Sequence, residues 1–340
     1  MLAKCHIDLG IPYHTCNLNC HYCYIGQRED KGGRGHTSDT KLRYPIPHMV
    51  KALSVERLGG KSIINLCASG ETLLPPYILE LIQELLMEGH YVTVVTNATL
   101  TERFNEIALM DEVLLERLFF KCSFHFLELK RKNLMDTFFR NIKSIREMGA
   151  SFSVELCASD ELEPYIDEIK EICMKEVGAY PHVVIPRTDD RKELLSKHTL
   201  AQFKDIWKVF DSALFDFKAK YWGEKRTEFC RAGEYEFLVN GGNGNYSKCY
   251  KQGVTQNLFE DISKPILFEP VGFECKMPHC YNAHIFLGFG CIGEIHDTTY
   301  ADMRDRIDAN TGEHWLNATI REVFSHYFSE YGGKTTNDTF

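Results

Sequence analysis

The chain of 340 residues suits about two domains, and its 44% hydrophobic residues supply a large core. The net charge of −9 argues against non-specific nucleic-acid binding, which depends on neutralising phosphates with Lys and Arg. Thirteen cysteines are too sparse for a disulfide-stapled scaffold. The first residues lack the pattern of a signal peptide, and no apolar run approaches the roughly 18 residues of a membrane span. We therefore expect a cytoplasmic protein with reduced thiols.

A repeating unit of strand followed by helix runs along the chain up to residue 218, which is typical of a parallel α/β fold. After a long first connection the strands recur about every thirty residues, the length of one such unit. The right-handed crossover rule predicts a curved sheet with helices outside it, and does not by itself close a barrel. The expected strands are residues 4–9, 62–67, 91–96, 118–125, 151–157 and 182–186. One expected helix has the apolar stripe Phe138, Ile142, Ile145 and Met148, and ends at Gly149.

Three cysteines lie within eight residues, directly after the first expected strand: Cys16, Cys20 and Cys23. Three thiolates can bind three irons of a cubane, whereas an electron-carrying [4Fe-4S] centre normally takes four cysteines. The spacing therefore predicts a cluster with one iron left open for a substrate or cofactor. A zinc site that adds His14 or His21 is the alternative, because zinc modules also use closely spaced cysteines.

The spacing C-x3-C-x2-C, with an aromatic residue before the last cysteine, resembles the signature of the radical S-adenosylmethionine (radical SAM) superfamily. The resemblance implies that the open iron chelates the methionine part of S-adenosylmethionine (SAM). It implies that Tyr22 lies against the adenine, and a ring packed under the loop is the alternative. The six strand–helix units in turn resemble the partial (β/α)6 TIM-like barrel of this superfamily. The radical chemistry would belong to the cofactor, which the protein binds and orients.

Two expected strand ends carry motifs that resemble elements of the superfamily. Ser69-Gly70-Glu71 is similar to its Gly-Gly-Glu element, which implies that Glu71 binds the SAM ammonium while Gly70 permits close approach. A helix N-terminal turn is the alternative. Thr96-Asn97-Ala98 is similar to Thr-Asn-Gly, so Asn97 either contacts the cofactor or makes an Asx turn. By analogy, Ser123 and Glu155 on the next two strands contact the ribose or the carboxylate of SAM.

The fourth and fifth expected strands carry their polar residues on one face, because side chains alternate along a strand. A fully packed barrel interior would be filled with Val, Ile and Leu, so this face predicts a polar cavity. A solvated sheet edge is the alternative. The residues of this face are Lys121, Ser123, His125, Ser153 and Glu155. Cys157 would face the same cavity, whereas Cys5, Cys67, Cys122 and Cys173 are expected to be inert and buried.

Beyond residue 218 the pattern changes to a small cysteine-rich α+β extension. An alternating run at 234–240, a glycine-rich turn and a short strand ending at Cys249 predict a β-hairpin. The cysteines around it resemble the auxiliary-cluster extensions called twitch and SPASM, although a full SPASM carries a denser set. We expect a second [4Fe-4S] cluster, with Cys291 replacing a ligand or donating a hydrogen atom. A zinc site of Cys275 and Cys280 with His279 or His284 is the alternative. The expected ligands are Cys230, Cys249, Cys275 and Cys280.

The expected domains are a radical SAM barrel at 1–218 and an auxiliary-cluster extension at 219–331, followed by a frayed tail at 332–340. The charged, glycine-rich segment at 27–36 predicts a mobile loop beside the first cluster.

The resemblance implies an enzyme that cleaves SAM reductively to a 5′-deoxyadenosyl radical, which abstracts a hydrogen atom from a substrate. Relatives with such extensions often modify ribosomally made peptides, so a peptide or protein substrate is the first expectation. The first cluster cysteine lies sixteen residues in, which leaves no room for a fused N-terminal leader-recognition domain. A small molecule such as a saccharide, acted on by an oxidoreductase or epimerase, is the alternative. Flavodoxin or ferredoxin would supply the electron. A non-enzymatic iron–sulfur carrier or zinc-stabilised binding module is the alternative from another class.

Overall fold

The computed structural model describes residues 3–26, 41–189, 193–250 and 252–330. The predicted mobile loop at 27–36 and the predicted frayed tail at 332–340 lie outside these residues. Among the described helices, none combines the length and the apolar character that crossing a membrane needs.

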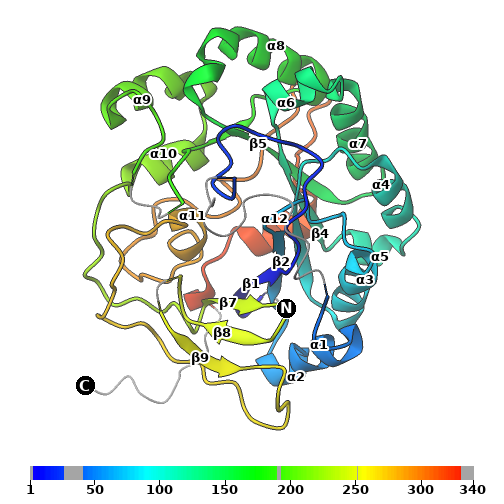
Figure 1. Cartoon of the computed structure of the whole chain (residues 1–340), viewed down its shortest axis with the longest axis vertical. Helices are drawn as coiled ribbons and strands as arrows, with labels where there is room; N and C mark the ends of the chain where they lie inside the picture. Colours follow the sequence, from blue (N-terminus) through cyan, green and yellow to red (C-terminus); the bar gives the residue numbers. More distant parts are fainter. Residues whose placement is uncertain (1–2, 27–40, 190–192, 251, 331–340) are drawn as a thin grey trace.

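One curved sheet organises the chain, with helices packed around its outside (Figure 1). Its order is β6-β5-β4-β3-β2-β1-β7-β8-β9, and β1 to β6 run parallel in chain order, so the sheet is an open, partial barrel. The predicted α/β partial barrel is confirmed. The strands are β1 (His6–Ile11), β2 (Ile63–Ala68), β3 (Tyr91–Thr96), β4 (Leu118–Ser123), β5 (Ser151–Cys157), β6 (His182–Val184), β7 (Glu236–Asn240), β8 (Asn245–Ser247) and β9 (Val254–Asn257).

The helices follow the strands as the periodicity predicts. In α7 (Met135–Glu147), Phe138, Ile142 and Ile145 are buried against the sheet, and Gly149 then adopts a left-handed φ of 81°. The other α-helices are α1 (Ile46–Ala52), α2 (Val55–Leu58), α3 (Ile78–Glu88), α4 (Thr101–Ile107), α5 (Glu112–Leu115), α6 (Phe126–Arg131), α8 (Ile166–Val177), α9 (Leu200–Trp207), α10 (Ala213–Lys220), α11 (Ala283–Phe286) and α12 (Ala318–Phe324). Short 3-10 helices are η2 (Asp160–Tyr165), η3 (Lys208–Phe210) and η4 (Phe328–Glu330).

The predicted hairpin forms from β7 and β8, but its place in the molecule was not foreseen. β7 pairs in parallel with β1, so the hairpin and β9 extend the barrel sheet beyond its first strand. The bounds of four predicted strands were also wrong. The second strand is Ile63–Ala68 rather than 62–67, and the sixth is His182–Val184 rather than 182–186. The first strand runs from His6 to Ile11 rather than over 4–9, and the fourth ends at Ser123 rather than at His125.

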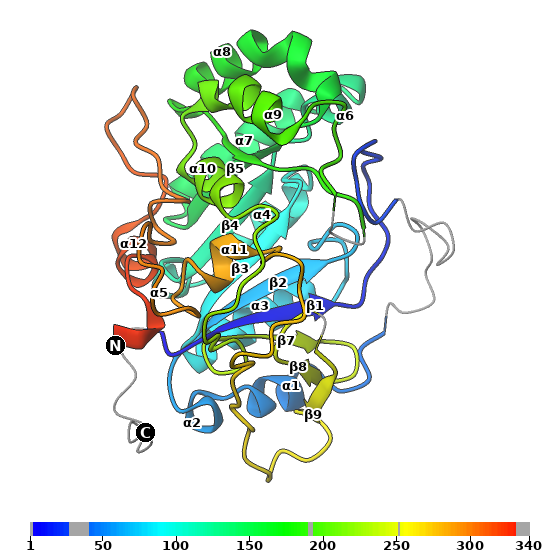
Figure 2. The ribbon, with the colours of Figure 1, turned by 90° about the vertical axis from the view of Figure 1, so that its left-hand side faces the viewer.

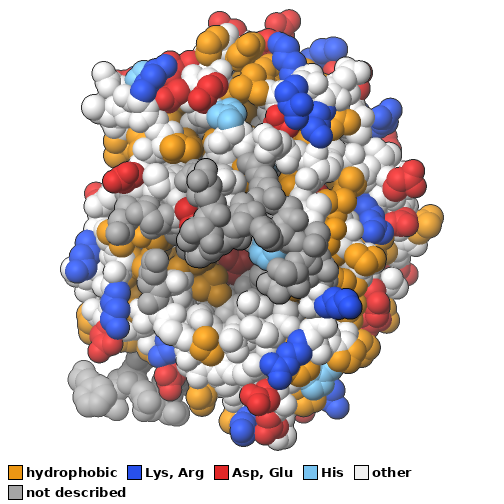
Figure 3. All heavy atoms as spheres, in the orientation of Figure 1, with side chains coloured by type: hydrophobic (Ala, Val, Ile, Leu, Met, Phe, Trp, Pro, Cys, Tyr) orange, Lys and Arg blue, Asp and Glu red, His pale blue; other side chains and the backbone are white. Residues whose placement is uncertain are grey.

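The C-terminal segment covers the amino ends of the strands. Phe289, Tyr300 and Phe324 form a second core with Ile63 and Tyr91, which are the first residues of β2 and β3. Figure 2 shows α12 at this end of the sheet and the loop after β1 at the opposite end. The carboxyl ends of the strands therefore stay free of this packing, and they face the viewer in Figure 1. The same face is hollowed near its centre in Figure 3.

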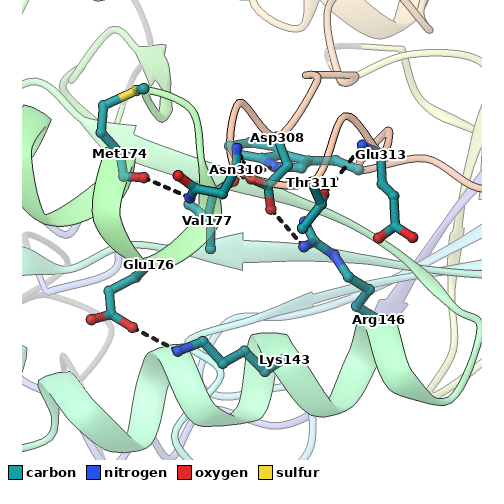
Figure 4. A network of polar contacts seen from close by, with 10 residues as sticks. Lys143, Arg146, Met174, Glu176, Val177, Asp308, Asn310, Thr311 and Glu313 are labelled. Carbon is teal, nitrogen blue, oxygen red and sulfur yellow. Dashed lines mark hydrogen bonds and ion pairs between the residues drawn. The ribbon is translucent and has the colours of Figure 1, made fainter.

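An ion pair ties the C-terminal segment to α7 (Figure 4). Arg146 Nη1 donates to Asp308 Oδ2 at 2.6 Å, and the backbone N–H of Asn310 donates to Asp308 Oδ1 at 2.9 Å. Asn310 Nδ2 also donates to the carbonyl of Met174 in α8, at 3.1 Å. The Asp308 side chain is only 4% exposed. Its charge therefore depends on these donors.

Replacing Arg146 with methionine should lower the free energy of unfolding by about 2 kcal/mol, because Asp308 would remain buried without its cation. Lys143→Met on the same helix is the matched control, since its pair with Glu176 is more exposed and its loss should cost less than about 1 kcal/mol. Urea unfolding of both variants measures the difference. Equal losses would contradict the role given to Asp308.

Candidate active site

A cavity of about 1130 Å³ lies at the carboxyl ends of the strands and extends along the inner face of the sheet. The predicted polar face lines it through Lys121, Ser123, His125 and Glu155. Ser153 instead is fully buried, and its hydroxyl donates to Glu155 Oε1 at 3.1 Å. Two cysteines that end strands also line the cavity. They are Cys157, as expected, and Cys67, which was expected to be inert.

The loop after β1 brings Cys16, Cys20 and Cys23 to this cavity, and none of the three is in a disulfide bond among the described residues. The backbone N–H of Cys23 donates to the Cys20 carbonyl at 3.2 Å, which makes a tight turn between two of the thiols. Asn97, at the end of β3, fixes the loop from the side because its Nδ2 donates to Asn17 Oδ1 at 2.7 Å. The same Nδ2 lies 3.9 Å from Cys16 Sγ. The sheet therefore holds the cysteine loop in place.

Gly70 joins the end of β2 to the start of the cysteine loop. Its N–H donates to the Tyr13 carbonyl at 2.9 Å, and the N–H of Glu71 donates to the Thr15 carbonyl at 3.0 Å. A Cβ at position 70 would lie 2.0 Å from the Thr15 carbonyl oxygen, so only glycine permits this approach. The close approach expected at Gly70 is therefore to the cysteine loop, one residue before Cys16.

Gly70→Ala should accordingly displace the cysteine loop and reduce both bound iron and SAM cleavage by about tenfold or more, since small displacements of a reacting group are costly. Gly293→Ala is the control, because that glycine is exposed and a Cβ there meets nothing within 4 Å. Iron analysis and 5′-deoxyadenosine formation measure the effect. Wild-type values in Gly70→Ala would exclude this contact as the determinant of the loop.

Glu71 presents a fixed carboxylate at the edge of the cavity. Its Oε1 accepts from Thr96 Oγ1 at 2.6 Å and from the N–H of Leu73 at 3.1 Å, while Oε2 accepts from the N–H of Asn97 at 2.8 Å. Burial raises the pKa of Glu71, and these hydrogen bonds oppose the increase. Because an ionised carboxylate has about four acceptor positions, Oε2 keeps room for a ligand's ammonium group.

Asn97 makes the Asx turn that was one of the two roles left open by its motif, and its contact with the cofactor stays a prediction. Its Oδ1 accepts from the N–H of Thr99 at 3.2 Å, which is an Asx turn, and its side chain also lines the cavity. Ala98 follows with a left-handed φ of 53°. This conformation is the one that glycine adopts at no cost, which gives a physical reason for glycine at this place in the motif it resembles.

Tyr22 lines the cavity beside the cysteines, with its hydroxyl 2.7 Å from His125 Nδ1. Burial, and then the neighbouring thiols, raise the pKa of Tyr22, so the phenol stays protonated and donates to His125. Glu155 is held differently, by an ion pair in which Arg304 Nη1 lies 2.5 Å from its Oε1. Burial acts to raise the pKa of Glu155, but Arg304 and Lys121 outweigh it and the pKa is lowered.

The sequence did not indicate several residues of this cavity, which come from four distant parts of the chain. Asp8 accepts hydrogen bonds from Asn65 Nδ2 at 2.8 Å and from the hydroxyl of Tyr250 at 3.1 Å. Lys218 of α10 also lines the cavity. Only the alternation along β1 could have indicated Asp8, because the residues on either side of it, Ile7 and Leu9, are apolar and buried. Tyr250 and Lys218 belong to no local motif.

The predicted auxiliary ligands come together in a second, smaller pocket. Cys230, Cys249, Cys275 and Cys280 all line it as free thiols. Burial raises the pKa of Cys230 to about 11 and that of Cys249 to about 12, with the nearby thiols adding to the effect, so both are protonated at neutral pH without a metal. Cys291 is fully buried and packs in the same small core as Ala232 and Phe286. Cys249 and Tyr250 line the large cavity as well, so the two hollows are neighbours with two lining residues in common.

The spacing of the cysteines bears on which metal group they fit. A tetrahedral zinc ion with Zn–S bonds near 2.3 Å would hold its sulfur ligands within about 3.8 Å of one another. Among the residues that the structure describes, Asp160, Glu163 and His198 alone offer three such ligand atoms within 4.8 Å of one another. Neither cysteine set converges on one ion, and His21 is hydrogen-bonded to Ser159.

Residues 11–157 match the family model described as the radical SAM superfamily. This stretch of the chain matches a radical SAM domain. The matched stretch begins at the last residue of β1, contains the three cysteines and Glu71, and ends at the last residue of β5. No match was found among curated proteins.

Two solved structures similar to this chain are of Streptococcus suis SuiB. In one SuiB is bound to the precursor peptide SuiA, with 16% identity, a TM-score of 0.52, and coverage of 76% of this chain and 63% of that one. In the other SuiB is bound to S-adenosylmethionine, with the same identity and TM-score, and coverage of 76% and 64%. At this identity the likeness shows the fold, an open α/β barrel. The chain spans less than two thirds of the length of SuiB.

Proposed function

We propose that this chain is a radical SAM enzyme that cleaves SAM reductively and abstracts a hydrogen atom from a substrate in the large cavity. The observation that carries the proposal is that the three cysteines of the loop and Glu71 line one cavity. Cys16, Cys20 and Cys23 would hold a [4Fe-4S] cluster, and Glu71 Oε2 would accept from the SAM ammonium. When bound, the cluster and SAM supply a 5′-deoxyadenosyl radical.

The remaining residues of the proposed SAM site would orient and shield the cofactor. Tyr22, held by His125, offers a ring face beside the cysteines, and Gly70 and Asn97 fix the loop that carries them. Ser123 and Glu155 end or nearly end the next two strands and would contact the ribose or carboxylate. Glu155 already accepts from Arg304, so a contact with SAM would use its other oxygen.

A peptide or protein is the first proposed substrate. SuiB, which shares the fold, is bound to a precursor peptide in one structure, and the cavity here is large enough for a side chain to enter beside SAM. A small molecule such as a saccharide, acted on by an oxidoreductase or epimerase, is the second candidate, because the deep part of the cavity is polar and closed by the C-terminal segment.

The second cysteine pocket would hold an auxiliary [4Fe-4S] cluster on Cys230, Cys249, Cys275 and Cys280. Support comes from Cys249 and Tyr250, which line both hollows and would place that cluster close enough to accept an electron from a substrate in the large cavity. Cys291 remains the predicted substitute ligand or hydrogen donor. A reduced flavodoxin or ferredoxin would supply the electron for SAM cleavage.

The proposal is tested by incubating the anaerobically reconstituted protein with dithionite and SAM. We expect 5′-deoxyadenosine to form, and iron analysis to give about eight irons per chain for two cubanes. About four irons would remove the auxiliary cluster and leave the SAM site. A protein that binds iron and forms no 5′-deoxyadenosine would be a non-enzymatic carrier, and zinc in place of iron would indicate a binding module.

A further inference from the structure

We propose that the deep part of the large cavity binds an anionic group of the substrate, a carboxylate or a phosphate, between Lys121 and Lys218. This inference rests on the proposed function, because it assigns a substrate chemistry to the same cavity. It goes further in predicting that the substrate is negatively charged close to the reacting position.

The two lysines reach the cavity from two different elements and are not paired there. Lys121 belongs to β4 and Lys218 to α10, and both line the cavity. Among the described residues, neither ammonium group has a hydrogen-bond partner or a carboxylate within 4.0 Å. An unpaired charge taken out of bulk water is costly, so the fold keeps two cations in a position that a bound anion would stabilise.

The nearby carboxylates do not supply that anion. Glu155 is already paired with Arg304, and Glu236 is hydrogen-bonded to His6, so each of these pairs carries little net charge. Asp8 is the remaining carboxylate on the strands in this deep part, and its single negative charge balances one cation at most. The unmatched charge in the deep part of the cavity is therefore positive.

His284 of α11 provides a second, independent indication. Its side chain is 9% exposed and lines the same cavity, yet its Nδ1 has no hydrogen-bond partner among the described residues. Burial, followed by the charges of Lys218, Arg304 and Lys121, lowers the pKa of His284 well below its ordinary value. A neutral imidazole surrounded by cations can donate one N–H to an anion.

The chemistry of these groups selects the ligand. Ammonium groups only donate hydrogen bonds, so a complementary ligand must offer several acceptors, and a negative charge strengthens each bond. Lys121 lies two residues before Ser123, which places its Cα about 7 Å deeper along β4 than the end where the proposed SAM contacts lie. The anion subsite is therefore distinct from the position of the SAM carboxylate.

Lys218 also gives the site a pH dependence. Burial, then the charges of Arg187 and Arg304, lower the pKa of Lys218 to about 8, while Glu155 and Cys157 act in the opposite direction. Anion binding needs the protonated amine, so affinity should be full below pH 7 and should be lost as the pH rises through 8. Between pH 7 and pH 9 the affinity should fall about tenfold.

The test uses the reconstituted full chain with SAM, titrated calorimetrically at constant ionic strength with sodium phosphate or with sodium glutarate. We expect at least one probe to bind, and Lys121→Met and Lys218→Met to weaken that binding by about tenfold or more. Lys220→Met is the matched control, because Lys220 lies on the same helix but is exposed, and it should bind as the wild type does. Binding of phosphate alone indicates a phosphorylated substrate, and binding of glutarate alone indicates a carboxylate.

The inference is overturned if neither probe binds, or if both lysine variants bind as the wild type does. If the variants do not fold, the pH dependence of probe binding by the wild type still decides, with the affinity for phosphate calculated for its dianion because phosphate itself titrates near pH 7. An unchanged affinity for glutarate or for the phosphate dianion from pH 7 to pH 9 contradicts the role of Lys218. Formation of 5′-deoxyadenosine without substrate separates the two proposals. Its absence in the wild type defeats the proposed function, whereas its presence without anion binding defeats only this inference.

Discussion

Replacing Cys20 with alanine is expected to abolish SAM cleavage, lowering 5′-deoxyadenosine formation by about a thousandfold or more. Each thiolate of the loop would hold one iron, so loss of one thiol opens a second iron and weakens the cluster. Cys20 is the most buried of the three cysteines, at 6% exposure. Alanine at this position removes the thiol and leaves the solvent-exposed surface of the loop almost unchanged.

Cys173→Ala is the matched control for this substitution. Cys173 is fully buried in α8, on the outside of the sheet, and its loss should cost about 1 kcal/mol of stability without affecting the reaction. Iron content and 5′-deoxyadenosine formation are measured on both variants. Substantial SAM cleavage by Cys20→Ala, with normal iron, would remove this cysteine from the cluster site.

The second large effect is expected at Arg304. Arg304 is fully buried and forms an ion pair with Glu155, and both residues line the cavity. Arg304→Met should lower the free energy of unfolding by about 3–5 kcal/mol, because a carboxylate would remain without its cation. Arg304→Lys keeps the charge and should cost less. Adding Glu155→Gln to Arg304→Met should restore part of the loss, since the unpaired charge is then removed.

The pH dependence of the same pair follows from its charges. The pKa of Glu155 is lowered in the folded chain, so its contribution to stability is present above the ordinary pKa of a carboxyl group. It should be lost as the pH falls from there through the lower pKa of the folded carboxyl group, because the unfolded chain takes up the proton first. Urea unfolding at pH 7 and pH 4 measures this contribution. An equal pH dependence in wild type and in Arg304→Met/Glu155→Gln would contradict it.

The barrel could be predicted because its information is local. Each strand from β1 to β6 is a short apolar run between turn signals, and each helix after it has its own apolar stripe, as in α7. The pairing of β7 with β1 could not be predicted, because those strands are more than two hundred residues apart and no pattern in either specifies the other. The packing of Phe289 and Phe324 over the amino ends of the strands is non-local in the same way.

The residues of the site likewise fall into those that a local motif indicates and those that only the fold brings together. Cys16, Cys20 and Cys23 were recognised by their spacing and Glu71 by its place after β2, and all of them line one cavity. The buried basic side chains that line the inner part of that cavity were not recognised. Arg304 lies in an irregular segment, Lys218 is one of two lysines in the last turn of α10, and His284 follows no motif. Their roles depend on which distant residues the fold places next to them. A single sequence contains no local pattern that identifies those neighbours.

The central claim is that the cluster on Cys16, Cys20 and Cys23 keeps one iron open for SAM. Electron paramagnetic resonance of the dithionite-reduced protein, recorded with and without SAM, tests it most directly. A Cys230→Ala/Cys280→Ala variant should simplify the spectrum by removing the auxiliary signal. We predict that SAM changes the remaining [4Fe-4S] signal. A signal that is identical with and without saturating SAM would contradict the claim.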